Sequence, residues 1–227
     1  MILYAIPSAL GGPAADALPE SSIRIVRSLR DFAVENAKSA RAFLGGLGLA
    51  VRDLNIVVIN ENVSTLLKPL REGRSLGLLS EAGCPAIADP GAALVEAAHR
   101  EGFRVVPLVG PSSIVLALMA SGLEGQRFAF CGYLPREEIS RKKEIQKLER
   151  RSRQEKETEI FIETPYRNDA MLLSLLETCD ENTRICVAAD LTLPTESIVT
   201  KSVKQWRRAG TAIGRRPAVF LLLADSR

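Results

Sequence analysis

The amino-acid sequence predicts an α/β protein with two domains. In the first half of the chain, short and almost continuously apolar runs alternate with helix-like segments, which is typical of a parallel sheet covered by helices on both faces. From residues 122–126 onward, a highly charged helical segment and further strands indicate a mixed α/β arrangement. The chain has 227 residues, 46% of them hydrophobic, which is enough for two compact cores. We therefore predict domains at residues 1–123 and 124–227.

The strands of the first domain are predicted from its apolar runs. They lie at residues 2–6, 32–34, 55–59, 75–79 and 103–108. Ser21 and Ser22 can cap a short helix that runs to Arg30, and Asp89-Pro90 is typical of the N-cap and first position of a helix, which would end at Gly102. Further helices are expected at residues 37–47, 63–71 and 114–120.

The second domain is predicted from strands that flank charged or amphipathic helices. Its strands are expected at residues 127–132, 159–163, 184–189, 198–203 and 218–224. Helices are expected at residues 136–157, where few apolar side chains interrupt the charge, and at residues 167–178. No internal repeat or low-complexity run is present.

The net charge excludes two classes of protein, and its distribution is more informative. With 30 Lys and Arg against 27 Asp and Glu, the chain is neither a polycationic nucleic-acid wrapper nor an acidic tail protein. Residues 136–157 hold nine basic and six acidic side chains, and residues 201–216 hold six basic side chains and no acid. Either stretch could contact RNA phosphates. The alternatives are a solvated helix with pairs such as Glu138–Lys142, and Trp206 as a packing anchor instead of a base-stacking platform.

Cysteine, histidine and hydropathy exclude further chemistry. The four cysteines form no C-x-x-C pair, so no zinc site or disulfide framework is expected, and free thiols indicate a reducing cytoplasm. His99 is the single histidine, which rules out a catalytic triad and a His-rich metal centre, and we expect a half-exposed helix residue and no bound metal. No window approaches the length of a membrane span, so we expect a cytoplasmic protein.

Three Gly- and Pro-rich loops follow predicted strands of the first domain. They are IPSALGG, SEAGCPAIADPG and VGPSS. Ligands of open α/β sheets bind outside the carboxyl ends of the strands, so three such loops at one edge favour a small-molecule site. The alternative is that each is an ordinary turn. GxGxxG and the Walker A lysine loop are both missing, which excludes dinucleotide and nucleoside-triphosphate fingerprints.

A set of motifs carries a resemblance to a known family. The segments SEAGCPAIADPG, PLVGPSS, ASGL, FAFCGYLP and IFIETPYR occur in this order, with the core of the match between Ser80 and Arg167. In order and spacing they resemble the tetrapyrrole methylase superfamily. Within it, they are similar to the branch of the bacterial small-subunit rRNA cytidine 2′-O-methyltransferases, which read approximately DAG-P-ISDPG, PGPSA, SGL, F-GFLP and E-SP-R.

The resemblance implies a fold, a methyl donor and a set of donor-binding residues. The fold would be two α/β domains of the tetrapyrrole methylase type, with S-adenosylmethionine in the cleft between them, usually in a homodimer. The donor-binding residues carried over are Pro7, Glu81, Ala82, Gly83, Ile87, Ala88, Asp89, Ser112, Ser113, Glu163, Thr164, Asp190, Leu191 and Thr192.

Candidate catalytic residues follow from the chemistry of the implied acceptor. A ribose hydroxyl is a weak acid and benefits from a general base or a polarising cation. Glu35 and Glu163 are candidate bases, and Lys38 and Arg41 are candidate cations or phosphate contacts. Each has a structural alternative, because Glu163 can pair with Arg167 and Glu35 with Lys38.

The chain departs from the resembled branch at two motifs. Where the rRNA enzymes read approximately AEDTR-T-R, residues 34–41 carry Asn36 in place of the Asp, and where they read RELTK, residues 189–193 lack both basic side chains. Three functions therefore stay open: methylation of RNA, most of all rRNA; methylation of a corrin-type or other small acceptor; and a non-catalytic ligand-binding homologue.

Overall fold

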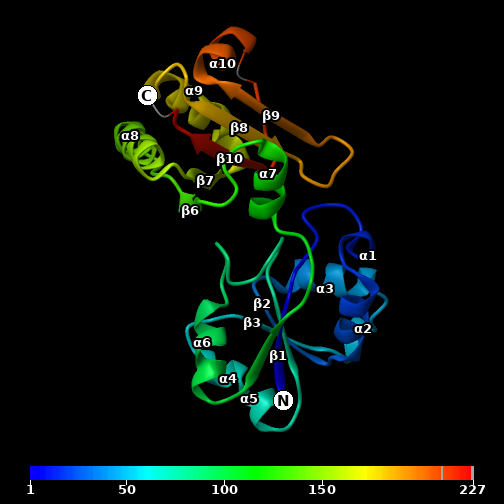
Figure 1. Cartoon of the computed structure of the whole chain (residues 1–227). Helices are drawn as coiled ribbons and strands as arrows, with labels where there is room; N and C mark the ends of the chain where they lie inside the picture. The colour runs from blue at the N-terminus through cyan, green and yellow to red at the C-terminus, as the bar shows by residue number, and fades with distance from the viewer. Residues whose placement is uncertain (211, 226–227) are drawn as a thin grey trace. The chain divides into compact units, whose positions relative to one another are not determined.

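The computed structural model describes residues 1–210 and 212–225, which form two compact units, Met1–Ser112 and Ser113–Arg227 (Figure 1). Thr211 of the basic stretch and the last two residues of the second predicted domain lie outside the described residues. The units divide eleven residues before the expected boundary at 123/124. The reason is that α7 (Ser113–Ser121) packs on the second sheet, where Ala117 is fully buried and Thr200 Oγ1 donates to the Ser121 carbonyl at 2.6 Å.

The first unit contains a parallel sheet, as predicted. Its strands are β1 (Ile2–Ile6), β2 (Asp31–Val34), β3 (Asn55–Val58), β4 (Leu76–Leu79) and β5 (Arg104–Pro107). They lie in the order β3-β2-β4-β1-β5, and every neighbouring pair is parallel. Since β4, β1 and β5 are adjacent, the loops that follow these strands start from one edge of the sheet.

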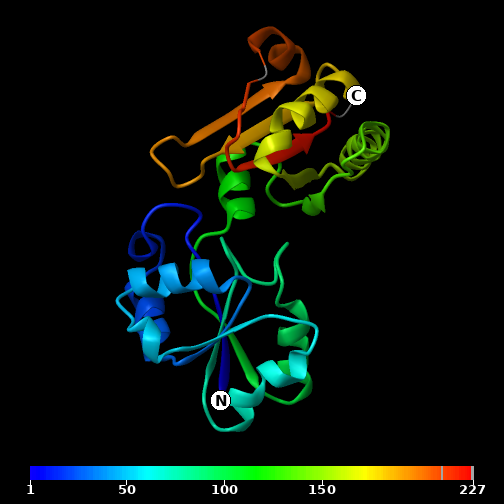
Figure 2. The ribbon, with the colours of Figure 1, turned by 180° about the vertical axis from the view of Figure 1, so that it is seen from behind.

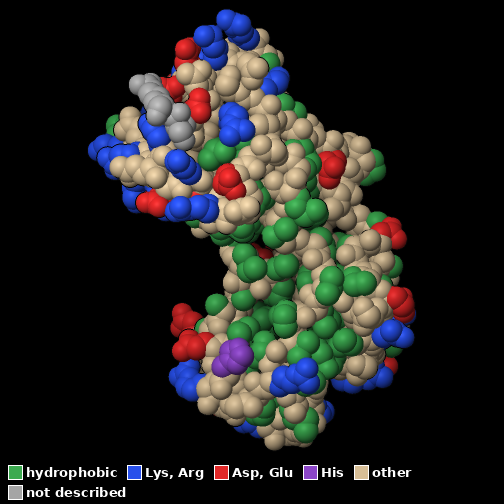
Figure 3. Space-filling view, viewed as in Figure 1, with side chains coloured by type: hydrophobic (Ala, Val, Ile, Leu, Met, Phe, Trp, Pro, Cys, Tyr) green, Lys and Arg blue, Asp and Glu red, His purple; other side chains and the backbone are tan. Residues whose placement is uncertain are grey.

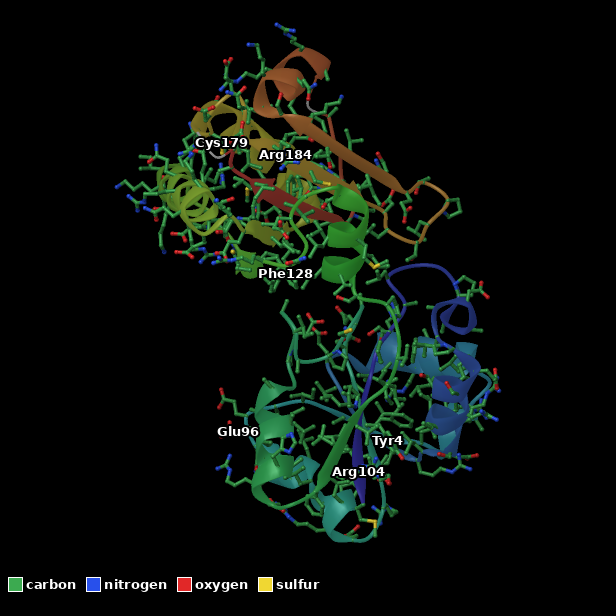
Figure 4. All side chains as sticks on the ribbon, viewed as in Figure 1. Tyr4, Glu96, Arg104, Phe128, Cys179 and Arg184 are labelled. Atoms are coloured by element: carbon green, nitrogen blue, oxygen red, sulfur yellow. The ribbon has the colours of Figure 1, made fainter. Side chains whose placement is uncertain are left out.

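Helices cover both faces of this sheet (Figures 1 and 2). One face carries α1 (Ala14–Ala17), α2 (Glu20–Ser28), α3 (Ala37–Gly46) and the turn η1 (Val51–Asp53); the other carries α4 (Val63–Leu66), α5 (Lys68–Arg71) and α6 (Ala92–Arg100). Along β2, Phe32 and Val34 pack into the first core and Ala33 into the second, as the two-residue period of a strand requires. Figure 4 shows Glu96 of α6 pointing away from the sheet, and His99 is exposed in the last turn of that helix.

Three details of the predicted helices are wrong. α2 begins at Glu20 after Pro19, and Ser22 lies inside it, where its hydroxyl donates to the Val109 carbonyl at 3.0 Å. α6 begins at Ala92 after Gly91 at φ 133°, a conformation that only glycine adopts readily, so Asp89-Pro90 is not its start.

The helix expected at residues 63–71 is divided into α4 and α5 at Leu67. Pro69 explains the division, because it has no backbone N–H to continue the hydrogen-bond ladder. The proline instead occupies the first turn of α5, where a missing donor is tolerated.

The second unit is a mixed α/β arrangement, and its sheet contains both parallel and antiparallel pairs. Its described strands are β6 (Phe128–Tyr133), β7 (Thr158–Glu163), β8 (Arg184–Ala189), β9 (Ser197–Ser202) and β10 (Ala218–Leu223), in the order β6-β7-β10-β8-β9. Only β6 and β7 pair in parallel. Phe161 and Phe220 stack at 5.8 Å between ring centres in its core, and Figure 4 labels Phe128 on the edge strand β6.

The helices of this unit lie on both sides of its sheet. They are α7, α8 (Glu138–Glu155), the turn η2 (Pro165–Arg167), α9 (Asn168–Thr178) and α10 (Val203–Ala209). Figures 1 and 2 show α7 and α9 on opposite faces. β10 therefore lies between two layers, and all six of its residues are buried.

All four cysteines lie within the described residues and are free thiols, and Cys179 and Cys186 are buried. Burial, with the neighbouring Glu159 carboxylate, raises the pKa of the Cys131 thiol to about 11, so this thiol is protonated at neutral pH. Across residues 1–210 and 212–225, no helix combines the length and the apolar character that crossing a membrane requires.

Candidate functional site

Three loops of the first unit meet at the carboxyl edge of its sheet. Ser8, just after β1, exchanges two backbone hydrogen bonds with Gly83 of the loop after β4, at 2.8 and 3.1 Å. The Ser8 hydroxyl adds a bond to the Ser80 carbonyl at 2.9 Å. Cys84 Sγ lies 3.5 Å from the Pro111 carbonyl of the loop after β5. The predicted convergence of the three loops is therefore confirmed.

Close packing and unusual backbone angles occur where these loops meet. At Gly110 a methyl group would lie 2.5 Å from Pro7 Cβ, so only glycine fits between the first and third loops. Ala86 and Ala88 have φ of 67° and 64°, a left-handed conformation that costs a side-chain-bearing residue roughly 1 kcal/mol. Such strain persists where surrounding contacts impose it, and it gathers at ligand-binding loops.

The carboxylates at this edge lie close together. Glu35 Oε2 accepts the Glu81 backbone N–H at 2.9 Å, and Glu81 Oε1 accepts the Ser39 hydroxyl at 3.2 Å. Burial and the nearby Glu35 charge raise the pKa of Asp89, although a hydrogen bond with Ser80 opposes the shift. Glu35 therefore holds the second loop through a main-chain bond, and among the described ion pairs none joins Glu35 to Lys38.

The altered motif at residues 34–41 forms the start of α3. Asn36 is the N-cap, and its Oδ1 accepts the N–H groups of Lys38 and Ser39 at 2.8 and 3.4 Å. Asn and Asp cap helices about equally well, so the substitution preserves this local structure while removing one negative charge. Lys38 and Arg41 are exposed on the first two turns of the helix.

A cavity lies beside the first loop. Its volume is about 400 Å³, and it is lined by residues 8–14, Ala42, Phe43 and Gly46 of α3, and Glu81 and Ala82. A second cavity, of about 300 Å³, lies beside Asp31 and Arg74 at the amino ends of β2 and β4. Because ligands of open α/β sheets bind at the carboxyl ends of the strands, we assign the candidate site to the carboxyl edge, beside the 400 Å³ cavity.

The candidate residues of the second unit also lie at one edge of its sheet. Ala218, the first residue of β10, pairs with Glu163 at the end of β7 and with Ala189 at the end of β8. Thr164 and the loop of Asp190, Leu191 and Thr192 therefore follow neighbouring strand ends. Asp190 and Thr192 have φ of 52° and 71°, which repeats the left-handed backbone of the first unit's loops.

Glu163 and the half-buried Arg167 form an ion pair with unused hydrogen-bonding capacity. Glu163 Oε1 accepts Arg167 Nη2 and the Thr164 backbone N–H, and the Glu163 side chain is 1% exposed. Glu163 Oε2 and Arg167 Nη1 are buried and have no partner among the described residues, and the same holds for Asn168 Oδ1. Buried polar atoms are normally satisfied, so these atoms are spare hydrogen-bonding capacity at the end of β7.

This edge also contains a cation that the sequence did not predict. Arg216 Nε donates to Asp190 Oδ2 at 2.7 Å, and this bond, with one from Thr195, lowers the pKa of Asp190. Residues 189–193 lack the basic side chains of the resembled motif, but Arg216, from the segment before β10, brings a guanidinium to the same loop. Within the described part of the chain, no group of three His, Cys, Asp or Glu side chains could hold a metal.

Among the described residues, four of the nine basic side chains of the first basic stretch form ion pairs, and they are Lys142, Lys147, Arg151 and Arg153. In α8, Lys142 pairs with Glu138, as expected for a solvated helix, and Arg151 pairs with Glu157 and Glu159. Arg141 is buried and donates to Ser174 Oγ at 3.0 Å. Figure 3 shows blue and red side chains interspersed over this part of the second unit.

The second basic stretch buries its tryptophan. Trp206 is 8% exposed, and its Nε1 donates to the Ile185 carbonyl at 2.9 Å, so it is the packing anchor and not a stacking platform. The exposed ring near this stretch is Tyr166, which is 77% exposed and lies 5.1 Å from the Arg215 guanidinium carbon. Sequence reasoning missed Tyr166, although it lies in the TPYR motif, whereas Arg215 belongs to the basic stretch expected to contact RNA.

Comparisons with known proteins show the family of this chain. Residues 13–206 match the model of the tetrapyrrole (corrin/porphyrin) methylases. The chain is 31% identical to a ribosomal RNA small subunit methyltransferase I from Halalkalibacterium halodurans, over 93% of this chain and 73% of that protein. It is also 31% identical to the protein of the same name from Vibrio cholerae, over 87% of this chain and 67% of that protein.

Solved structures show the same fold at lower identity. A diphthine synthase superposes with a TM-score of 0.68 at 14% identity, over 99% of this chain and 90% of that chain. The uroporphyrin-III-C-methyltransferase of Thermus thermophilus gives 0.57 at 21% identity, over 98% and 94%. The family match, the identities and the two sheets together lead to one conclusion: this chain belongs to the tetrapyrrole methylase family and is a methyltransferase.

Proposed function

We propose that this protein transfers a methyl group from S-adenosylmethionine to a ribose 2′-hydroxyl of small-subunit ribosomal RNA. The observation that carries the donor assignment is the pair of buried, unpartnered atoms Glu163 Oε2 and Arg167 Nη1. A methionine tail has an ammonium and a carboxylate, which match a free carboxylate oxygen and a free guanidinium nitrogen. The acceptor assignment is supported by the names of the curated relatives.

The donor-binding residues that the resemblance implies are proposed in each unit separately. From the first unit they are Pro7, Glu81, Ala82, Gly83, Ile87, Ala88, Asp89 and Ser112. From the second they are Ser113, Glu163, Thr164, Asp190, Leu191 and Thr192. These loops offer backbone N–H and C=O groups and apolar walls, which suit an adenosine, and carboxylates, which suit a sulfonium. S-adenosylmethionine, when bound, supplies the electrophilic methyl group.

We further propose separate roles for the candidate catalytic residues. Glu35 is the favoured general base, because Oε2 is anchored by the Glu81 N–H at the loop edge while the side chain stays partly exposed. Glu163 is buried and paired with Arg167, which suits donor binding better than proton transfer. Lys38 and Arg41 are exposed on α3 and suit phosphate contacts.

Isothermal titration calorimetry with S-adenosylmethionine tests the donor site. We expect Glu163→Gln to weaken binding about tenfold or more, the effect of losing one charge-assisted hydrogen bond. Glu159→Gln is the matched control, because Glu159 is also fully buried and paired with an arginine, Arg151, away from the proposed site. No heat for the wild-type protein at millimolar donor, or equal losses in both variants, would contradict the assignment.

Tritiated donor and 30S subunits from a strain lacking this gene test the acceptor. We expect label in the rRNA and its loss in Glu35→Gln. Donor binding without RNA labelling would favour the small-molecule acceptor or the non-catalytic homologue. We also propose a homodimer in the cytoplasm, and a monomeric mass by light scattering at micromolar concentration would refute the dimer.

A further inference from the structure

We infer that Tyr166 and Arg215 form a stacking platform for one unpaired nucleobase of the RNA acceptor. This inference rests on the proposed RNA function and adds to it two recognition residues. Tyr166 is 77% exposed, and the Arg215 guanidinium carbon lies 5.1 Å from its ring centre. A ring that stays this exposed beneath a guanidinium must keep its opposite face open to solvent.

The main chain beneath both side chains is held in place. Tyr166 lies in η2, directly before Arg167, which donates to both Glu163 and Thr164. On the other side, Asn168 Nδ2 donates to the carbonyls of Gly214 and Arg216 at 3.0 and 2.7 Å, so both neighbours of Arg215 are fixed.

Further bonds tie the loop before β10 to the start of α9. Asp169 Oδ1 accepts the N–H groups of Ile213 and Gly214 at 2.8 and 3.2 Å. Asn168 is fully buried, so a buried polar side chain is used to position an exposed loop. A platform whose two members are positioned before binding loses less entropy when a base stacks on it.

The charge of Arg215 suits a nucleic acid. Among the described residues, no acidic side chain forms an ion pair with Arg215, whereas its neighbour Arg216 is neutralised by Asp190. Arg215 therefore keeps a positive charge beside an exposed aromatic ring, and this combination binds single-stranded nucleic acids through stacking and phosphate contact. The other aromatic–cation pair, Lys201 over Trp206, cannot take a base because its ring is buried.

The location relates the platform to the proposed methyl transfer. Tyr166 follows Glu163 and Thr164 by two to three residues at the carboxyl end of β7. Arg215 precedes β10, whose first residue pairs with Glu163. A base stacked on Tyr166 would hold the RNA at the same sheet edge as the proposed donor-binding residues. The pair is thus a positioning element for the acceptor.

Fluorescence anisotropy with a fluorescein-labelled ten-nucleotide oligocytidylate tests the platform. We expect Tyr166→Ala to raise Kd about 5- to 100-fold, the effect of losing one base stack, with an unchanged salt dependence. Tyr166→Phe keeps the ring and should restore binding to within about twofold of wild type. Arg215→Ala should reduce the slope of log K against log salt by about 0.7, the value for one phosphate contact on a single strand.

Two controls and a second readout separate the outcomes. Phe128→Ala removes another exposed ring of the same unit, and Arg184→Ala removes an exposed charge outside both basic stretches; neither should reproduce the loss. Calorimetry with S-adenosylmethionine should be unchanged in Tyr166→Ala. Wild-type RNA binding and labelling with an unaltered Tyr166→Ala would overturn the platform alone, whereas a wild-type protein that neither binds nor labels RNA would overturn the proposed function as well.

Discussion

The contact between Gly110 and the first loop makes a sharp prediction about the candidate site. In Gly110→Ala the added methyl group would lie 2.5 Å from Pro7 Cβ, 2.7 Å from Leu18 Cδ2 and 2.8 Å from Pro7 Cγ. All three distances are shorter than carbon atoms tolerate, and two of them involve a rigid proline ring. The third loop must therefore move away from the first, which separates Pro7 from Ser112.

The expected loss of stability in Gly110→Ala follows from the cost of overpacking. Inserting a methyl group into a close-packed site costs about 1–3 kcal/mol, which for a chain of this length lowers Tm by about 2–12 °C. Because the displaced loops carry proposed donor contacts, we expect affinity for S-adenosylmethionine to fall about tenfold in addition, a loss of about 1.4 kcal/mol. Differential scanning fluorimetry measures the first effect, and calorimetry on the folded protein measures the second.

Two glycines serve as matched controls. In Gly77→Ala the methyl group would lie 2.6 Å from Phe32 and 2.8 Å from Ile6, so the same sheet is overpacked in its core and not at its loop edge. This variant should lose stability and keep its donor affinity. Gly125→Ala has no atom within 4 Å and should behave as wild type. The reasoning is refuted if Gly110→Ala binds the donor normally, or if Gly77→Ala loses affinity to the same extent.

Three further predictions concern stability and pH. Burial raises the pKa of Asp31, but the hydrogen bond and charge of Arg74 bring it below its ordinary 3.8. The ion pair therefore stabilises the fold above pH 3.8, and this stabilisation is lost as the pH falls through the pKa of the folded state. We expect Asp31→Asn to lower the free energy of unfolding, measured by chemical denaturation, by about 1 kcal/mol at pH 7 and not at all in strong acid. Trp206→Phe loses the hydrogen bond to the Ile185 carbonyl, so the free energy of unfolding should fall by about 1 kcal/mol while RNA affinity is unchanged. A loss of RNA affinity without a larger loss of stability would instead support Trp206 as a base-stacking residue. Burial and neighbouring carboxylates raise the pKa of Asp89, so the folded state disfavours its negative charge. Asp89→Asn should therefore raise Tm at pH 7, where the carboxylate is charged, and not at pH 3. A lower Tm at pH 7 would contradict this direction of the pKa shift.

The sequence predicted the strands well and the helix starts less well. The interior strands β2 and β10 are largely apolar runs whose side chains are buried whichever neighbour they take, so they could be recognised without knowing the strand order. A helix start depends on local angles and on competition for hydrogen bonds. Ser22 illustrates this, since its hydroxyl bonds the Val109 carbonyl, 87 residues away, instead of capping α2.

The domain boundary also depends on contacts between residues that lie far apart in the sequence. Gly122 is a strong breaker, and a division after it was a natural expectation. The units divide at Ser112 because α7 packs against β9 and β10, which lie about 80 to 100 residues later in the chain. No pattern within α7 itself could reveal which sheet it covers.

The sequence by itself determined the family, the α/β class and the three loops of the first unit, because these depend on local motifs and on apolar periodicity. Only the tertiary structure decided which charged and aromatic side chains are available for chemistry. It paired Glu163 with Arg167, buried Trp206, and brought Arg215 over Tyr166, 49 residues away in the sequence. The physical reason is that burial and pairing depend on the register of β7, β8 and β10, which brings distant strand ends to one edge of the sheet.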